Sequence, residues 1–167
     1  MYKRQGVEAA HSVFRQGLKC CLITFKKETI GQMSCNPAIG GLGKSHLVRE
    51  IDALGGVMAQ ATDQSGIQSR TLNTRKGFAV QALRVQCDRD KYKRAIQNIL
   101  FETNIVIKEG EVVDIHLQGD TIKGVELSNG EKIESLKVIL TTGTFLNGVM
   151  YKGDEATVGG RVGDDSS

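Results

Sequence analysis

The sequence predicts an α/β fold in a single domain, and three features support this prediction. Residues 6–17 have the apolar spacing of a helix and lead into a nearly continuous apolar strand over 20–25, the second half of a βαβ unit. Residues 111–136 alternate with a period of two around two turn signals, which is typical of a three-stranded antiparallel meander. Residues 138–142 form another apolar strand of the buried, parallel type.

Length and composition fit a globular chain with an ordinary core. The 167 residues are 40% hydrophobic and 25% charged. Twenty-two Lys and Arg against nineteen Asp and Glu leave a formal charge of +3, which neither requires nor excludes a nucleic-acid partner. No apolar stretch approaches the roughly 20 residues of a membrane span, and no apolar run follows the first five residues as in a secretory signal. We therefore expect neither a membrane protein nor a secreted one.

Two further helices and one irregular stretch are predicted between these features. A helix over about 44–54 has its inward face formed by Leu47, Val48, Ile51 and Leu54. Residues 63–77 are polar and predict an irregular segment with a short strand. The clearest helix opens at Asp88 and Asp90. Its apolar face is formed by Tyr92, Ala95, Ile96, Ile99 and Leu100.

The cysteine and histidine positions indicate neither a disulfide framework nor a metal site. The chain has four cysteines and no C-x-x-C pair, so we expect reduced thiols and no metal centre. Cys20 and Cys21 in a strand, and Cys87 at the end of a helix-like run, are assigned to packing. Cys35 instead falls in a loop, where it is either a nucleophile activated by positive charge or a small buried side chain.

Two glycine patterns are compatible with a nucleotide site. Gly6 before two alanines matches the last glycine of a dinucleotide fingerprint, although a single glycine at a helix start is more often ordinary. The loop at 31–43 is rich in glycine and small residues and precedes Lys44. It does not match the phosphate-binding pattern of nucleotide triphosphatases, because Ala38 stands where that pattern has glycine.

A basic stretch follows, with eight Lys and Arg and two Asp between residues 70 and 94. It could contact RNA phosphates by counterion release, and a solvated helix face with a loop explains it equally well. Only Phe78 and Tyr92 provide aromatic rings there, so base stacking is not expected.

Together these residues resemble one family, the GidA/MnmG flavoproteins that modify the wobble uridine of tRNA. The loop Gly-Gln-Met-Ser-Cys-Asn-Pro-Ala-Ile-Gly-Gly at 31–41 is similar to the family signature. Further similar segments are 50–56, 63–68, 72–73, 76–77 and 142–146. The resemblance runs over residues 6–167. It implies a glutathione-reductase-type, Rossmann-like FAD-binding domain that is incomplete in this chain, with an atypical start at residues 1–5, no first strand and a truncated C-terminal end.

The resemblance also implies an activity and partners. Family enzymes use FAD, NADH and methylene-tetrahydrofolate, and act as homodimers that form a heterotetramer with the GTPase MnmE. They add a carboxymethylaminomethyl-type group to C5 of the wobble uridine in tRNA. The implied location is the bacterial cytoplasm, or alternatively the mitochondrial matrix. The chain by itself is expected to fold poorly, to bind little FAD and to have no turnover.

Individual residues receive roles by the same resemblance. Gly6, Val112 and Ser167 match FAD contacts, and Gly40, Gly41 and Gly143 are further cofactor-binding candidates. Cys35 is a candidate for covalent catalysis or for shaping the flavin site. The candidate tRNA contacts are Arg70, Arg75, Lys76 and Arg84. Phe78 and Gln81 depart from the family pattern, which has proline and arginine at these positions.

Two alternative functions remain open at this stage. The chain could be a non-catalytic RNA-binding fragment that uses the basic stretch at 70–94. It could also be a generic flavin-dependent oxidoreductase of the disulfide-reductase type, although Cys35 has no nearby cysteine partner.

Overall fold

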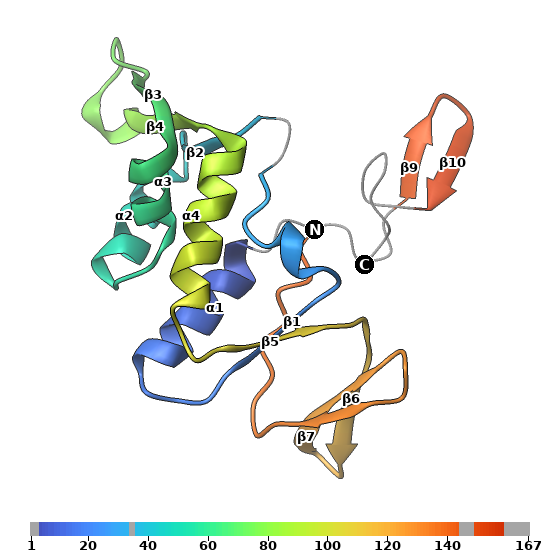
Figure 1. Cartoon of the computed structure of the whole chain (residues 1–167). Coiled ribbons are helices and arrows are strands. Elements are labelled where there is room, and N and C mark those ends of the chain that lie inside the picture. Colours follow the sequence, from blue (N-terminus) through green and yellow to red (C-terminus); the bar gives the residue numbers. More distant parts are fainter. Residues whose placement is uncertain (1–3, 34–35, 144–148, 159–167) are drawn as a thin grey trace.

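The computed structural model describes residues 4–33, 36–143 and 149–158, and shows a mixed α/β fold (Figure 1). Its helices are α1 (Arg4–Arg15), α2 (Ser45–Ala53), α3 (Met58–Ser65) and α4 (Arg89–Phe101), with the 3₁₀ turns η1 (Lys27–Thr29) and η2 (Phe78–Val80). The strands form four small sheets, one parallel and three antiparallel.

The expected helix and strand at the start of the chain are confirmed. Helix α1 ends where Gly17 adopts a φ of +72°, and the Gly17 amide donates to the carbonyl of Phe14 as in a helix C-cap. Strand β1 (Cys21–Thr24) pairs in parallel with β5 (Val106–Glu109). The expectation that both faces of β1 are buried is wrong in part, because Cys21 is exposed. Strand β5 is the one neighbour that β1 has among the described residues.

A three-stranded antiparallel sheet lies where the sequence predicted mostly loop. Strand β4 (Ala82–Cys87) is central, between β2 (Ala38–Gly40) and β3 (Gly66–Leu72). Strand β2 lies within the glycine-rich loop. The short strand predicted within residues 63–77 is confirmed as β3, but this segment also contains the end of α3. Cys87 ends a strand and not a helix-like run. These elements depend on pairing between distant segments, which a local polar pattern does not report.

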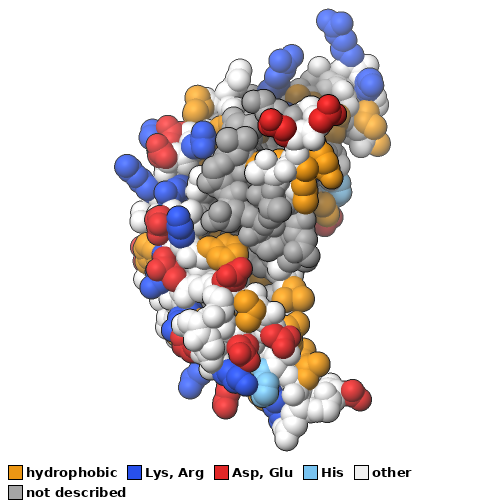
Figure 2. Space-filling view, turned by 90° about the vertical axis from the view of Figure 1, so that its right-hand side faces the viewer, with side chains coloured by type: hydrophobic (Ala, Val, Ile, Leu, Met, Phe, Trp, Pro, Cys, Tyr) orange, Lys and Arg blue, Asp and Glu red, His pale blue; other side chains and the backbone are white. Residues whose placement is uncertain are grey.

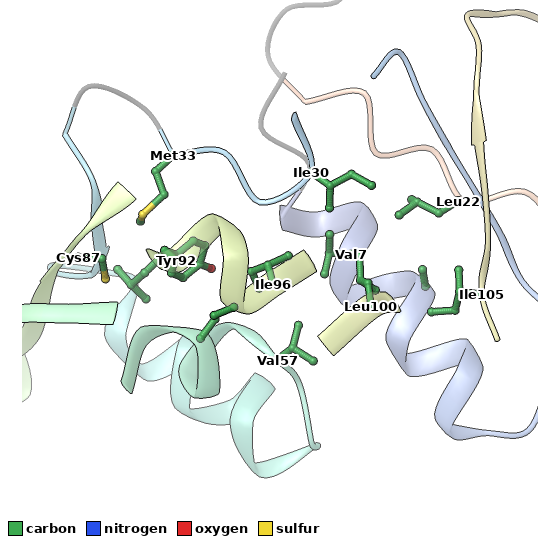
Figure 3. Packing of buried hydrophobic residues seen from close by; sticks show 14 residues of the cluster. Val7, Leu22, Ile30, Met33, Val57, Cys87, Tyr92, Ile96, Leu100 and Ile105 are labelled. Carbon is green, nitrogen blue, oxygen red and sulfur yellow. The ribbon is translucent and has the colours of Figure 1, made fainter. Parts of the chain in front are cut away.

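Helix α4 confirms the prediction for residues after Asp88. The Asp88 carboxylate caps the helix by accepting from the amides of Asp90 (3.0 Å) and Lys91 (2.8 Å). The buried face of α4 forms the centre of the hydrophobic core (Figure 3). Around it pack side chains from α1, α3, β1, β2, β4, β5 and the loops, including Val7, Leu22, Ile30, Met33, Val57, Cys87 and Ile105.

Helix α2 confirms the predicted helix but not its whole inward face. Val48 packs against the core, whereas Leu47 is 48% exposed and Leu54, which follows the helix, is 80% exposed. The helix contacts α3, β2 and β4, all on one side. Only a narrow stripe of α2 is therefore covered by the described residues.

The predicted meander is confirmed. Strand β7 (Thr121–Leu127) is central between β6 (Val112–Gln118) and β8 (Lys132–Glu134), with antiparallel pairing on both sides. The Asn129–Gly130 signal forms the second turn, where the Glu131 amide donates to the Asn129 side chain at 3.0 Å and Gly130 has a φ of +82°.

The prediction of a buried strand over residues 138–142 is wrong. These residues form no regular element, and Ile139 and Leu140 are 62% and 64% exposed. A parallel strand needs a ladder partner, and no strand of the described residues provides one for this segment. After it, β9 (Val149–Lys152) and β10 (Glu155–Val158) form a hairpin that stands apart from the other sheets (Figure 1).

The described surface has mixed charge. On the face shown in Figure 2, basic and acidic side chains are interspersed and apolar side chains are exposed between them. No helix within the described ranges is long and apolar enough to cross a membrane. The same ranges contain no group of three or more His, Cys, Asp and Glu side chains that could hold a metal ion.

Candidate functional site

The start of α1 packs unusually closely against its neighbours at Gly6. A Cβ built on Gly6 would lie 2.9 Å from Oγ1 of Thr141 and 3.4 Å from Cδ1 of Leu22. The first of these distances is too short for a real side chain. Gly6 therefore allows the first turn of α1 to approach both β1 and the 138–142 segment, which is the role of the last glycine in a dinucleotide fingerprint.

The glycine-rich loop leaves the core close to α4. Ile30 and Met33 are fully buried, and Figure 3 shows both within the cluster that surrounds α4. Gly31 has a φ of +77°, and a Cβ there would lie 2.9 Å from Cβ of Ile96. The first part of the loop is thus held firmly against one face of α4.

The loop returns through contacts with β4. The Cys87 amide donates to the carbonyl of Pro37 at 2.8 Å, and the Arg84 guanidinium donates to Oδ1 of Asn36 at 2.8 Å. A Cβ at Gly40 would collide with the carbonyl oxygen of Leu83. Packing of β2 against β4 therefore explains the glycine at position 40 without a ligand.

Gly41 differs from Gly40 in that no described atom crowds its Cβ position. Its φ is +96°, and among the described residues nothing lies within 4 Å of the position that a Cβ would occupy, although Gly41 itself is buried. Its amide donates to Leu83 at 2.8 Å, and its carbonyl accepts from the amides of Lys44 and Ser45 at the start of α2. The backbone of Gly41 is therefore held in place by hydrogen bonds, and its positive φ favours a glycine at this position.

The remaining cofactor candidates fall in other places. Gly143 follows Thr141 by two residues and has a φ of +73°, so its segment lies next to Gly6. Val112 opens β6, is 40% exposed and pairs with Leu127 in the meander. Cys35 and Ser167 lie outside the described residues.

The thiols that the structure describes are not activated nucleophiles. Burial raises the pKa of Cys87, which is in the core. Burial also raises the pKa of Cys20 and Cys21. All three stay protonated at neutral pH. The assignment to packing is confirmed for Cys87 and for Cys20, which packs partly buried against the core, but it is wrong for Cys21, which is exposed.

The four candidate RNA contacts lie on one β-hairpin, in two groups. Arg70 on β3 and Arg84 on β4 are cross-strand partners. Arg75 and Lys76 lie in the turn between the strands, where the Lys76 amide donates to the carbonyl of Asn73. Next to this turn, the Phe78 side chain on η2 is 90% exposed.

Sequence reasoning missed the neutral groups around the arginine pair. A hollow of about 230 Å³ is lined by Gln68, Arg70, Leu72, Arg84 and Gln86. The spacing of Gln68, Arg70 and Leu72 at every second position could have indicated that they share one face of a strand. The register that brings Gln86 opposite Gln68 has no signal in the sequence.

Comparison with known proteins matches residues 4–167 to the family model described as Glucose inhibited division protein A. The chain belongs to the GidA family. Two crystal forms of GidA from Aquifex aeolicus superpose with a TM-score of 0.91, at 47% and 48% identity. Each match covers 98% of this chain, but only 28% and 27% of the Aquifex chains.

More distant structures share the fold of this GidA-family chain. The GidA-related protein from Thermus thermophilus has a TM-score of 0.63 at 14% identity, with 99% of this chain and 64% of that chain covered. PqsL from Pseudomonas aeruginosa, a probable FAD-dependent monooxygenase, has a TM-score of 0.50 at 13% identity, with 79% and 38% covered. The resemblance inferred from sequence and the Rossmann-like α/β class are thereby confirmed.

The residues present fit a bound FAD in part. Gly6 provides the close packing of helix on strand. In the fingerprint G-x-G-x-x-G that ends at Gly6, however, Met1 and Lys3 occupy the two earlier glycine positions. Those glycines allow the backbone to approach the pyrophosphate. The helix-packing part of the site therefore fits the cofactor, and the pyrophosphate-binding part does not.

Proposed function

We propose that this protein acts as an FAD-dependent enzyme in tRNA modification, and that its product is a carboxymethylaminomethyl-type group at C5 of the wobble uridine. Membership of the GidA family over residues 4–167 carries this proposal. The superposition on Aquifex GidA supports it over the same span. FAD, when bound, would supply the redox chemistry of the reaction.

Several residues of this chain are suited to hold the cofactor. The N-terminal end of a helix carries a partial positive charge that favours an anion, so the start of α1 would contribute to cofactor binding. Gly6 lets the first turn of α1 approach Thr141, and Gly143 belongs to the same segment. Val112 and Ser167 remain proposed FAD contacts by family resemblance.

The glycine-rich loop would shape the reaction site. Its buried anchors, Ile30 and Met33, fix one end against α4, and Gly40 and Gly41 fix the other end against β4. A loop held at both ends can exclude water from a reactive one-carbon intermediate. Cys35 lies between these anchors in the sequence, so we propose that it either acts covalently or shapes the flavin side of the site.

The hairpin formed by β3 and β4 is our candidate for tRNA binding. Its four cationic side chains, Arg70, Arg75, Lys76 and Arg84, would each neutralise backbone phosphate and give binding that weakens as salt rises. The hairpin is connected to the glycine-rich loop by the hydrogen bond between Arg84 and Asn36. RNA bound on the hairpin would therefore lie beside the loop.

The other components of the reaction are proposed on family grounds alone. They are NADH, methylene-tetrahydrofolate and an MnmE-type GTPase that forms a heterotetramer with a homodimer of this protein. The proposed compartment is the bacterial cytoplasm, with the mitochondrial matrix as the alternative. We further propose that the 167-residue chain has no turnover on its own.

Analysis of tRNA nucleosides by mass spectrometry tests the proposed activity. Deleting the gene should leave C5 of the wobble uridine unmodified, and the wild-type gene should restore the modification. A Cys35→Ser variant should restore less modification than a Cys20→Ser control, since Cys20 is assigned to packing. Unchanged wobble uridine in the deletion strain would contradict the proposal.

A second candidate function is RNA binding without catalysis. Met1 and Lys3, in place of the two fingerprint glycines, favour it because they weaken the case for a bound pyrophosphate. Under this alternative, purified protein binds tRNA and carries no flavin. Modified wobble uridine that disappears with the gene would exclude it.

A further inference from the structure

Two arginines face each other across the antiparallel β3–β4 pair. Arg70 and Arg84 are directly opposite in the register, and Gln68 is opposite Gln86 two pairs along, on the same face of the sheet. Side chains in such positions have Cβ atoms about 4.5–5.5 Å apart on one face, and like charges directly opposite each other destabilise a sheet. The arrangement is therefore unfavourable unless a negative charge compensates it.

No described carboxylate supplies that charge. The ion pairs within the described ranges are Lys108–Glu131 and Lys132–Glu126, and neither arginine takes part in one. Gln68 and Gln86 are neutral, and their amide groups can donate hydrogen bonds. Both ends of this patch thus present donors and no anionic acceptor.

The guanidinium of Arg84 is held in position. One of its nitrogens donates to Oδ1 of Asn36 at 2.8 Å, which leaves its other N–H groups free to point elsewhere. Arg84 is also only partly exposed, whereas Arg70 is exposed. Arg84 is therefore anchored, while Arg70, opposite to it, is exposed to solvent. This arrangement suits a ligand that enters from solvent.

The space between them is the 230 Å³ hollow lined by Gln68, Arg70, Leu72, Arg84 and Gln86. We propose that this hollow binds one phosphate group, with Arg70 and Arg84 each donating to its oxygens. Guanidinium groups match phosphate in geometry and form bidentate, charge-assisted hydrogen bonds with it. A phosphate bound between the two arginines cancels their mutual repulsion. Both arginines therefore contribute to the affinity for the same anion.

This inference does not depend on a flavin or on uridine modification. The phosphate can belong to an RNA backbone or to a small phosphorylated ligand, and the chemistry of recognition is the same. Arg75 and Lys76 in the turn are not part of the site.

The test measures thermal melting of the protein, purified as its gene encodes it, during titration with inorganic phosphate. Chloride at matched ionic strength provides the baseline. Wild-type protein should melt at higher temperature as phosphate rises. Arg70→Gln and Arg84→Gln should each weaken the apparent phosphate affinity by at least about tenfold. Arg49→Gln, an exposed position on α2, is the matched control and should keep the wild-type response.

A second readout separates ligand binding from a structural role. In chloride alone, Arg70→Gln should melt at or above the wild-type temperature, because one of two opposed like charges is gone. Arg84→Gln also loses the hydrogen bond to Asn36, so this comparison is made with Arg70→Gln. Circular dichroism at low temperature checks that both variants are folded. Equal phosphate responses in all four proteins, or no response in the wild type, would overturn the inference.

A third arm identifies the source of the phosphate. An anticodon stem–loop RNA is titrated against the same proteins at several salt concentrations. Weaker binding and a smaller salt slope for Arg84→Gln than for wild type and Arg49→Gln assign the site to an RNA phosphate. RNA binding by Arg84→Gln that equals that of the wild type and Arg49→Gln, with the inorganic phosphate response lost only in Arg84→Gln, assigns it to a small ligand.

Discussion

The carboxylate of Glu8 in α1 caps the start of α3 at Met58. The Met58 amide donates to Oε1 at 2.7 Å, and the Val57 amide donates to both carboxylate oxygens at 3.1 Å. Helix α3 has no capping side chain of its own, since its N-cap residue is Val57. A Cβ at Gly56 would lie 2.6 Å from Oε2 of Glu8, so the glycine makes room for this contact. The cap joins two helices whose contacting residues lie 49–50 positions apart in the sequence.

Removing this cap should destabilise the fold. We expect Glu8→Ala to lower the free energy of unfolding by about 1–2 kcal/mol, the usual cost of losing a helix cap. Glu8→Gln keeps one acceptor oxygen and should lose less. Urea denaturation followed by circular dichroism measures the difference, with the exposed Glu50→Ala on α2 as the control. Equal stability of Glu8→Ala and Glu50→Ala would contradict the role of Glu8.

The hydroxyl of Tyr92 should contribute nothing to stability. Its side chain is fully buried in the core, and its oxygen has no hydrogen-bond partner in the part of the chain that the structure describes. Burial raises the pKa of Tyr92, so the group stays neutral. Tyr92→Phe removes a buried, unpaired polar atom and should leave the free energy of unfolding unchanged or raise it by about 1 kcal/mol. A loss of stability, relative to the exposed control Tyr151→Phe, would show that the hydroxyl has a partner.

The cap of α4 should make stability depend on acid pH. Hydrogen bonds from the amides of Lys91 and Asp90 lower the pKa of Asp88. The unfolded state therefore binds this proton more readily, and the stabilisation is present above the unfolded pKa of about 3.9 and lost as pH falls through the lower folded value. Asp88→Asn keeps an uncharged cap and should show a smaller fall in melting temperature between neutral and acid pH. An identical pH profile for the wild type and Asp88→Asn would contradict this assignment.

Close packing at Gly6 predicts that a second substitution, at Thr141, partly compensates for the effect of Gly6→Ala. Gly6→Ala places a methyl group against Oγ1 of Thr141, so it should lower the melting temperature and any flavin content together. Adding Thr141→Ala removes that oxygen and should recover part of both losses, a coupling that a double-mutant cycle measures. Gly77→Ala is the control, because its Cβ meets nothing within 4 Å. Additive effects of the two substitutions would argue against direct contact.

Local patterns predicted the elements that depend on local physics. The helix after Asp88 follows from a cap and an apolar face ending at Leu100, and the meander follows from alternation and the Asn129–Gly130 turn. Strand β2 and helix α3 were not predicted. Strand β2 exists because Gly40 permits close contact with Leu83, and α3 begins at a cap supplied by Glu8 from another helix. Neither partner is near in sequence.

The candidate site shows the same division. The sequence indicated Gly6 as a packing glycine and the 31–41 loop as a structured connection. It could not show that Arg70 and Arg84 are opposite each other while Arg75 lies in the turn, because that depends on the hairpin register. It also assigned Gly40 to the cofactor, whereas the contact with Leu83 already requires a glycine there.

The visible absorbance spectrum of the protein, purified as its gene encodes it and incubated with FAD, tests whether the protein holds a flavin. We expect a flavin spectrum that survives desalting and that is reduced in Gly6→Ala but not in Gly77→Ala. A colourless protein after desalting, in a sample that circular dichroism shows to be folded, would contradict this expectation.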